Sequence, residues 1–176
     1  MTMWVFGYGS LVWNPGFDTA ERVIATLPGY ARSFCMRSIH HRGTEDHPGL
    51  VLALDEAPRA RCQGVALAVD DVRADDVLEY LRERELVSAA YLERVLRVTL
   101  RDGREVEAVT YVVDADHVQY CGGLDREEQA LIIAGAIGGR GRNCEYLFNT
   151  AEHLHELGIH DPDLDWLAAR VRHLNG

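Results

Sequence analysis

The sequence predicts one domain of the α+β class, and three observations support that prediction. Apolar runs of strand length fill much of the first half of the chain. In the last third, apolar residues instead recur at helical spacing, between residues that typically start and end helices. The length of 176 residues suits a single hydrophobic core. We therefore expect residues 1–176 to form a single domain without a linker or an internal repeat.

Six segments are predicted to be strands. Four of them are apolar runs in the first half of the chain, at residues 3–8, 30–38, 50–54 and 63–69. The other two segments, 91–100 and 104–113, flank Asp102-Gly103. An Asp-Gly pair between apolar runs is a strong hairpin signal, so we expect these two strands to be antiparallel neighbours.

Four segments are predicted to be helices, at residues 70–87, 125–137, 143–158 and 160–174. The first begins with aspartates, which the positive end of a helix dipole favours. Asn143 is expected to cap the third helix and Gly158 to end it. Asp161 is expected to cap the fourth helix, with Pro162 in its first turn.

The composition narrows the classes of function. The chain is 47% hydrophobic and 26% charged, as is typical of soluble globular proteins. Its net charge of −10 disfavours nucleic acid as a partner. No run of about 18 apolar residues predicts a membrane span, and the first residues do not predict an export signal. All 18 cationic side chains are arginine, which excludes lysine Schiff bases and the lysine-containing phosphate loop.

The four cysteines are predicted to be reduced thiols that pack in the interior. They are Cys35, Cys62, Cys121 and Cys144, and none forms a close pair of the Cys-x-x-Cys kind. The cysteine spacing therefore disfavours a zinc site or a redox motif. This cysteine usage predicts a cytoplasmic protein.

Residues 7–11 read GYGSL and directly follow an apolar strand. They match a dinucleotide fingerprint only in part, because Val12 stands at the third glycine position. Trp13-Asn14-Pro15 is expected to oppose the helix that this motif requires. Ser10 also lacks the second glycine of a nucleophile elbow.

Two interpretations of this stretch remain open on the residues alone. It can be an ordinary glycine-rich turn after a strand. Alternatively, Gly7 and Gly9 let the backbone approach a ligand, so that successive N–H groups hold a carboxylate.

Residues 40–49, HHRGTEDHPG, combine histidines with acidic residues. Adjacent His40 and His41 on an extended segment point to opposite sides, so a shared metal ion is disfavoured and a solvated loop is expected. Ser38 and Arg42 are candidate donors to an anion.

A catalytic carboxylate is sought near residues 80–91, YLRERELVSAAY. Glu85 lies directly before Leu86 and Val87, where the chain leaves a helix toward the core. A carboxylate in such partly apolar surroundings has a raised pKa, as a general base requires. Glu83 competes for this role, and composition does not separate the two.

Four segments together resemble the ChaC family of glutathione-specific γ-glutamylcyclotransferases. They read WVFGYGSLVWNPGF, HRGTEDHPGLVLAL, RERELVSAAY and GRNCEYL, in the order and spacing of that family. The similarity spans nearly the whole chain, and the combination is more specific than the YGSL loop alone. It implies a small mixed β-barrel or curved sheet with flanking helices.

The resemblance also implies roles for individual residues. Arg84-Glu85, six positions before Tyr91, fits the family's catalytic glutamate, whereas Glu83 does not. The VFGYGS segment corresponds to the family's substrate loop. The residues expected to bind substrate are Val5, Phe6, Gly7, Tyr8, Gly9, Ser10, Leu11, Ser38, Arg42 and Tyr91.

The expected reaction is cleavage of glutathione to 5-oxoproline and Cys-Gly. The α-amine of the γ-glutamyl group attacks its own γ-carbonyl, with Glu85 as general acid and base. No cofactor or metal has a role in it. The rival functions are a cyclotransferase for other γ-glutamyl amines or amino acids, a non-catalytic module that binds γ-glutamyl ligands, and, least favoured, a Ser10 hydrolase. The expected partner is the small-molecule substrate, with no membrane; the sequence does not indicate an oligomeric state.

Overall fold

The computed structural model describes residues 2–86 and 90–176, which divide into two compact units. The first unit contains Met1–Arg32 and Leu54–Val118, and the second contains Ser33–Ala53 and Gln119–Gly176. Two long strands, β2 (Glu21–Ser38) and β3 (Gly49–Asp70), contribute residues to both. The expectation of a single domain stays a prediction.

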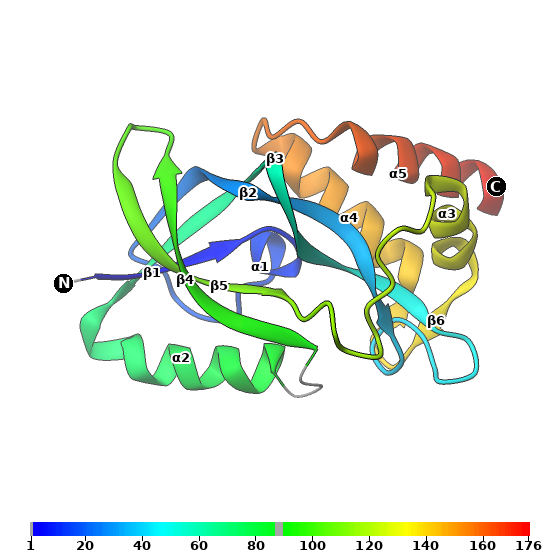
Figure 1. The fold of residues 1–176 in the computed structure, drawn as a ribbon, viewed down its shortest axis with the longest axis horizontal. Helices are drawn as coiled ribbons and strands as arrows, with labels where there is room; N and C mark the ends of the chain where they lie inside the picture. The colour runs from blue at the N-terminus through cyan, green and yellow to red at the C-terminus, as the bar shows by residue number, and fades with distance from the viewer. Residues whose placement is uncertain (1, 87–89) are drawn as a thin grey trace. The chain divides into compact units, whose positions relative to one another are not determined.

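Five strands close into a barrel in the order β1-β3-β2-β4-β5 (Figure 1). Besides β2 and β3, these are β1 (Thr2–Gly7), β4 (Tyr91–Leu100) and β5 (Glu105–Val113). β1 is antiparallel to β3 and parallel to β5, and this parallel pair closes the barrel. Closure gives each of these five strands a neighbour on both sides. The predicted α+β class with a small barrel is confirmed.

Two helices belong to the first unit. The short helix α1 (Ser10–Trp13) follows β1 almost directly, and α2 (Asp71–Glu85) follows β3. α2 packs against β1 and buries Val77 and Leu81. The prediction extended this helix to residue 87, but it ends at Glu85, and Val87 lies outside the described residues.

Three helices of the second unit pack against one another: α3 (Arg126–Gly135), α4 (Asn143–Glu156) and α5 (Pro162–Asn175). The two short strands β6 (Ile137–Gly138) and β7 (Gly141–Arg142) form a small ribbon between α3 and α4 in the chain. An ion pair between Arg170 of α5 and Glu127 of α3 joins two of the helices. These helices confirm the predicted helical character of the last third.

The strands β2 and β3 are longer than the sequence predicts. Residues 50–54 and 63–69 were expected to be separate strands, but both belong to β3, and β2 already begins at Glu21. The intervening residues 55–61 are polar and partly exposed, so they have no apolar run that indicates a strand. Hydrogen bonding to neighbouring strands of the barrel, which propensity does not report, keeps them extended.

Three local predictions are confirmed. Gly103 adopts a φ of +96° in the β4–β5 turn, where the Leu100 N–H donates to the Arg104 carbonyl at 2.7 Å. Such a φ favours glycine. The Asp161 side chain accepts from the Leu164 N–H and caps α5. Gly158 follows the end of α4 with a φ of +76°.

The predicted cap at Asn143 is wrong. Arg142 occupies the N-cap position, and Asn143 is fully buried in the first turn of α4. Its side chain accepts from the Leu50 N–H and donates to the Leu50 carbonyl, both at 2.8 Å. The Asn143 side chain therefore pairs with both backbone groups of Leu50. A buried strand end needs such partners for its N–H and C=O groups.

In the described residues, no helix is long and apolar enough to cross a membrane. The four cysteines are thiols; three are buried and Cys121 is half-buried, as predicted.

Candidate functional site

The glycine stretch after β1 turns directly into a helix. Tyr8 and Gly9 connect β1 to α1, and Gly9 is the N-cap residue. We expected Trp13-Asn14-Pro15 to prevent a helix here, but one helical turn forms, because α1 includes Trp13 and Asn14 is its C-cap residue. Pro15 limits the helix to four residues, since the residue before a proline disfavours helical backbone.

The apolar side chains of this stretch belong to the barrel core. Val5 and Phe6 are fully buried, and Tyr8 and Leu11 are nearly so. The Tyr8 hydroxyl donates to the Tyr111 carbonyl of β5 at 2.9 Å. These side chains are therefore part of the core packing, and their contact with substrate stays a prediction.

Gly7 is required for packing between β1 and α1. A Cβ atom at Gly7 would lie 3.0 Å from the Leu11 Cβ, which is closer than side chains normally approach. This glycine lets α1 fold back onto the end of β1.

Arg32 of β2 fixes the backbone at the start of the loop. Its Nε donates to the Tyr8 carbonyl at 2.7 Å, and its Nη2 donates to the Gln63 carbonyl of β3. Arg32 is not among the site residues predicted from the sequence. The sequence did contain a signal for such a role: Arg32 is a cation inside the predicted strand segment YARSFCM, and strands seldom bury a charge without a partner.

Arg84 joins the end of α2 to the glycine loop. Its Nη2 donates to Ser10 Oγ at 2.8 Å, and its Nη1 donates to the carbonyls of Asn14 at 2.6 Å and Pro15 at 3.1 Å. The side chain is only 11% exposed. A buried guanidinium needs such partners, so this contact set fixes its position.

The segment after α1 is also held against α2. Gly16 has a φ of +81°, and a Cβ atom there would lie 2.0 Å from the Tyr80 hydroxyl oxygen. Phe17 packs edge-on against the Tyr80 ring. The same Tyr80 hydroxyl accepts from Arg84 Nη1 at 3.2 Å. Only glycine fits this position, which brings the loop against the helix.

Glu85 lies beside this cluster. Its Oε1 is 3.6 Å from Arg84 Nε, and its side chain is 16% exposed. Glu83 is exposed. Of the two candidate glutamates, only Glu85 is thus partly enclosed and next to the arginine that contacts the loop. Its raised pKa stays a prediction.

Tyr111 of β5 belongs to a second polar group, and the charge of Glu85 acts on it. Its hydroxyl donates to Glu93 Oε1 at 2.8 Å, and Arg82 donates to both Glu93 oxygens at 3.0 Å. Burial, the hydrogen bond to Glu93, and the charges of Glu93 and Glu85 raise the pKa of Tyr111. Arg82 lowers the pKa of Glu93. Tyr111 therefore remains a neutral phenol near both carboxylates.

Tyr91 is the first residue of β4 and lies opposite Val113 of β5. Its ring is half-buried. Tyr91 therefore lies at a strand end in the first unit, and its contact with substrate stays a prediction.

Ser38 and Arg42 belong to the second unit. The Arg42 N–H donates to Ser38 Oγ at 2.9 Å, and Arg42 Nη1 donates to the Arg142 carbonyl at 3.1 Å. The guanidinium also lies over the Tyr146 ring, 5.7 Å from its centre. Ser38 and Arg42 are thus mutually in contact, and their role as anion donors stays a prediction.

The histidine segment is largely a solvated loop, as expected. His40 and His41 are exposed, whereas Arg42 is buried. Burial and the neighbouring Arg140 lower the pKa of His41. In the described ranges, no three His, Cys, Asp or Glu side chains gather as a metal site would require.

Comparison with known proteins identifies the family. Residues 3–174 match the model of the ChaC-like proteins, which is nearly the whole chain. The chain belongs to the ChaC-like family. Both compact units lie within the matched range.

Relatives of this ChaC-like chain carry a common name. A glutathione-specific γ-glutamylcyclotransferase of Escherichia coli is 37% identical over 98% of this chain and 74% of that protein. A Danio rerio protein named glutathione-specific γ-glutamylcyclotransferase 1 is 36% identical over 93% of this chain and 83% of its own length.

A crystal structure of a yeast γ-glutamyl cyclotransferase specific to glutathione has the same fold. It superposes with a TM-score of 0.88 at 25% identity, over 98% of this chain and 96% of the yeast chain. In this ChaC-like protein, the first unit brings Arg84 and Glu85 to Ser10 of the glycine loop.

Proposed function

We propose that this protein is a glutathione-specific γ-glutamylcyclotransferase that releases 5-oxoproline and Cys-Gly. The observation that carries the proposal is the Arg84 cluster. One guanidinium contacts Ser10 of the glycine loop, the chain after α1, and Glu85. Membership of the ChaC-like family and the names of its relatives support the same activity.

In the proposed reaction, the α-amine of the γ-glutamyl group attacks the γ-carbonyl carbon of the same group. A C–N bond forms and closes a five-membered ring, and the bond to the cysteine nitrogen then breaks. Holding a flexible chain in the folded pose contributes much of the acceleration, because well-oriented intramolecular reactions reach effective molarities of about 10⁵ M or more. The step consumes no water and needs no enzyme nucleophile.

Glu85 moves the proton in this proposal. Its carboxylate takes a proton from the substrate ammonium, which makes the amine nucleophilic, and later delivers it to the leaving nitrogen. The attacking nitrogen loses a second proton on ring closure, and the same carboxylate passes that proton to the amine of the released Cys-Gly. A positioned general acid–base group contributes about 10²- to 10⁴-fold. The partly enclosed position beside Arg84 supports Glu85 for this role, and the exposure of Glu83 argues against the alternative.

The glycine loop is proposed to bind substrate through its backbone. The first N–H groups of a helix have no acceptor within the helix, so the amides around Gly9, Ser10 and Leu11 are suited to a carboxylate or a developing oxyanion. Tyr91 is proposed to contact substrate from the start of β4. Ser10 is proposed to orient rather than attack, because its partner Arg84 cannot accept a proton.

The test is incubation of purified protein with reduced glutathione in water enriched in ¹⁸O. The expected products are equal amounts of 5-oxoproline and Cys-Gly, without ¹⁸O in the 5-oxoproline. Release of ¹⁸O-labelled glutamate would instead show hydrolysis. We expect γ-glutamyl-alanine and γ-glutamyl-lysine to be poor substrates; comparable turnover of all three would contradict glutathione specificity.

Because the proposed reaction uses no cofactor, activity should survive exhaustive dialysis against a chelator. Zinc-dependent recovery of a lost activity would overturn this part of the proposal. We further propose that the protein is cytoplasmic, which the four thiols support.

A further inference from the structure

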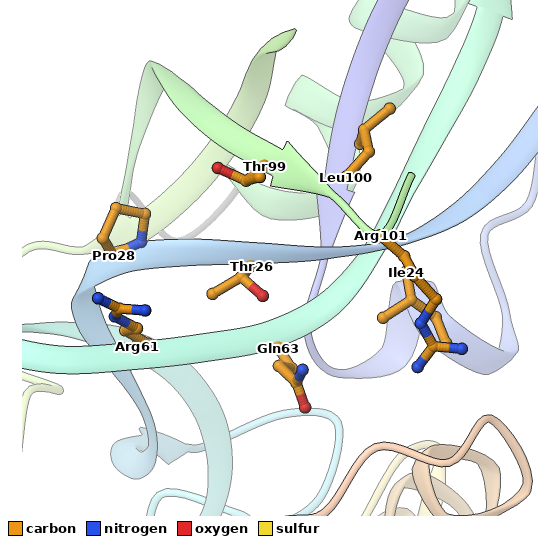
Figure 2. A pocket seen from close by; sticks show the side chains of 8 residues that line it. All are labelled: Ile24, Thr26, Pro28, Arg61, Gln63, Thr99, Leu100 and Arg101. Carbon is orange, nitrogen blue, oxygen red and sulfur yellow. The ribbon is translucent and has the colours of Figure 1, made fainter. Parts of the chain in front are cut away.

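A pocket of about 380 Å³ lies on strands β2, β3 and β4 (Figure 2). Its volume is in the range of small-molecule sites. It is lined by Ile24, Thr26, Pro28, Arg61, Gln63, Thr99, Leu100 and Arg101. None of these belongs to the site proposed above. Tyr91 and Thr99 lie eight residues apart on β4, roughly 26 Å along an extended strand.

The side chains that line the pocket are suited to an anion. Arg61 and Arg101 are cationic, and no carboxylate is among the lining residues. Gln63 and two threonines add neutral hydrogen-bonding groups. Ile24, Pro28 and Leu100 provide apolar surface for a carbon skeleton. In a chain with a net charge of −10, this hollow is thus lined by two guanidinium groups.

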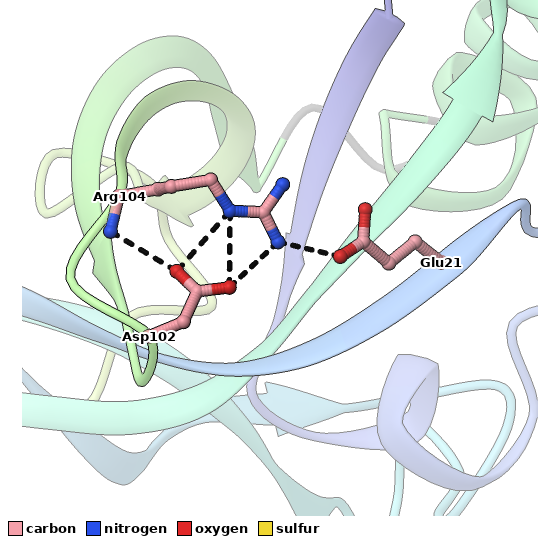
Figure 3. A network of polar contacts seen from close by, with 3 residues as sticks. All are labelled: Glu21, Asp102 and Arg104. Atoms are coloured by element: carbon pink, nitrogen blue, oxygen red, sulfur yellow. Dashed lines mark hydrogen bonds and ion pairs between the residues drawn. The ribbon is translucent and has the colours of Figure 1, made fainter.

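Arg104, in the neighbouring hairpin, is an arginine with acidic partners. Arg104 binds Asp102 and Glu21 together (Figure 3). These two carboxylates raise the pKa of Arg104. In the part of the chain that the structure describes, no acidic side chain lies within ion-pair distance of Arg61 or Arg101. The pocket therefore lacks the internal counterion that the adjacent hairpin has.

Most of the residues that line the pocket lie on paired strands, and Arg101 directly follows β4. Ala25 and Thr26 of β2 pair with Leu100 and Thr99 of β4. The Arg101 N–H donates to the Ile24 carbonyl at 2.8 Å. Such backbone pairing fixes the positions from which the lining side chains extend.

We propose that this pocket binds a small organic dianion, with Arg61 and Arg101 each contacting one acidic group. The ligand class follows from the volume, the two cations, of which Arg61 lies on β3 and Arg101 directly after β4, and the apolar side chains among the lining residues. A dicarboxylate meets all three requirements. The planar guanidinium suits a carboxylate because it can donate two parallel hydrogen bonds.

The experiment is a titration of the full ¹⁵N-labelled protein with succinate, monitored by amide chemical shifts at low ionic strength. We expect saturable shifts at Thr26, Gln63 and Arg101, without comparable shifts at Gly7 and Gly9. The uncharged isostere succinamide should cause none of them. Added salt should weaken binding, because the contacts are partly exposed.

The paired variant Arg61→Gln/Arg101→Gln should bind succinate about tenfold more weakly, as the loss of two partly exposed charge contacts predicts. Arg97→Gln is the matched control, because Arg97 is an exposed β4 arginine opposite Glu107 and outside the pocket. If the paired variant does not fold, each single variant should weaken binding by a smaller factor. Unchanged affinity on loss of the arginines, or succinate shifts confined to residues 7–11, would overturn the proposal. Because the titration measures binding and not turnover, its result is independent of the proposed catalytic function.

Discussion

The last turn of α2 has two faces that differ in their exposure and in their hydrogen-bond partners. Arg82 and Glu83 point outward, and the Arg82 side chain is 52% exposed. Arg84 and Glu85 follow directly and are mostly enclosed. Residues two positions apart on a helix are separated by about 200°, which places the two Arg-Glu pairs on opposite sides.

The two arginines illustrate how burial changes the value of a charge. Arg82 forms a bidentate ion pair with Glu93, in which solvent competes and the gain is small. Arg84 instead donates to two carbonyls and to Ser10, in surroundings where an unsatisfied guanidinium is costly. We therefore expect substitutions on the enclosed face to have large effects and substitutions on the exposed face to have small ones.

The largest effect is expected for Glu85→Gln. The substitution keeps size and hydrogen bonding but removes the basic carboxylate, so proton transfer should fail while the fold survives. We expect kcat to fall by roughly two decades or more. Steady-state release of 5-oxoproline, with thermal melts as a check on folding, provides the measurement.

Glu83→Gln is the matched control on the exposed face, and it should retain most of the activity. Near-normal turnover in Glu85→Gln, or loss of activity in Glu83→Gln alone, would contradict the assignment of catalysis to Glu85 on the enclosed face.

Arg84→Met is expected to have the next largest effect. It removes the donors to Ser10, Asn14 and Pro15, leaving these oxygens without their partner. We expect a loss of about 2–4 kcal/mol in the free energy of unfolding, together with reduced kcat/KM. Arg82→Met is the comparison, and its Tm should change little. Equal destabilisation by the two substitutions, measured by urea unfolding, would contradict the distinction between the faces.

Ser10→Ala should have a smaller effect. It deletes one acceptor of Arg84 Nη2 and changes the edge of the glycine loop. We expect a several-fold loss of kcat/KM, in proportion to roughly 1 kcal/mol for one hydrogen bond. The yield of 5-oxoproline per glutathione consumed should be unchanged. Isolation of a covalent acyl-enzyme on Ser10 from the unmodified protein would overturn the intramolecular mechanism.

The smallest effect is expected for the exposed pair and depends on pH. Arg82 lowers the pKa of Glu93 in the folded protein, so the pair stabilises the fold at pH values above the ordinary glutamate pKa of about 4.3. This stabilisation should disappear as pH falls through the lower folded pKa. Thermal melts of the unmodified protein and Glu93→Gln should therefore differ slightly at pH 7 and converge in acid. A difference that grows on acidification would refute this assignment.

The sequence determined the elements that depend on local chemistry. Asp102-Gly103 predicted the β4–β5 turn because Gly103 tolerates a positive φ. Asp161-Pro162 predicted the start of α5 because the aspartate satisfies a helix N–H and proline lacks one. The helix predicted at residues 70–87 also implies that Glu83 and Glu85, two positions apart, face different ways.

Only the tertiary structure decided how distant residues share polar partners. The length of β2 and β3 depends on hydrogen bonds to neighbouring strands, which their polar residues do not reveal. Asn143 was misassigned as a cap because its true partner, Leu50, lies 93 residues away. The link between Arg84 and Ser10 spans 74 residues and forms because folding buries a guanidinium that then requires acceptors. Local sequence specifies turns and caps through backbone preference, whereas these contacts arise only when burial removes water as an alternative partner.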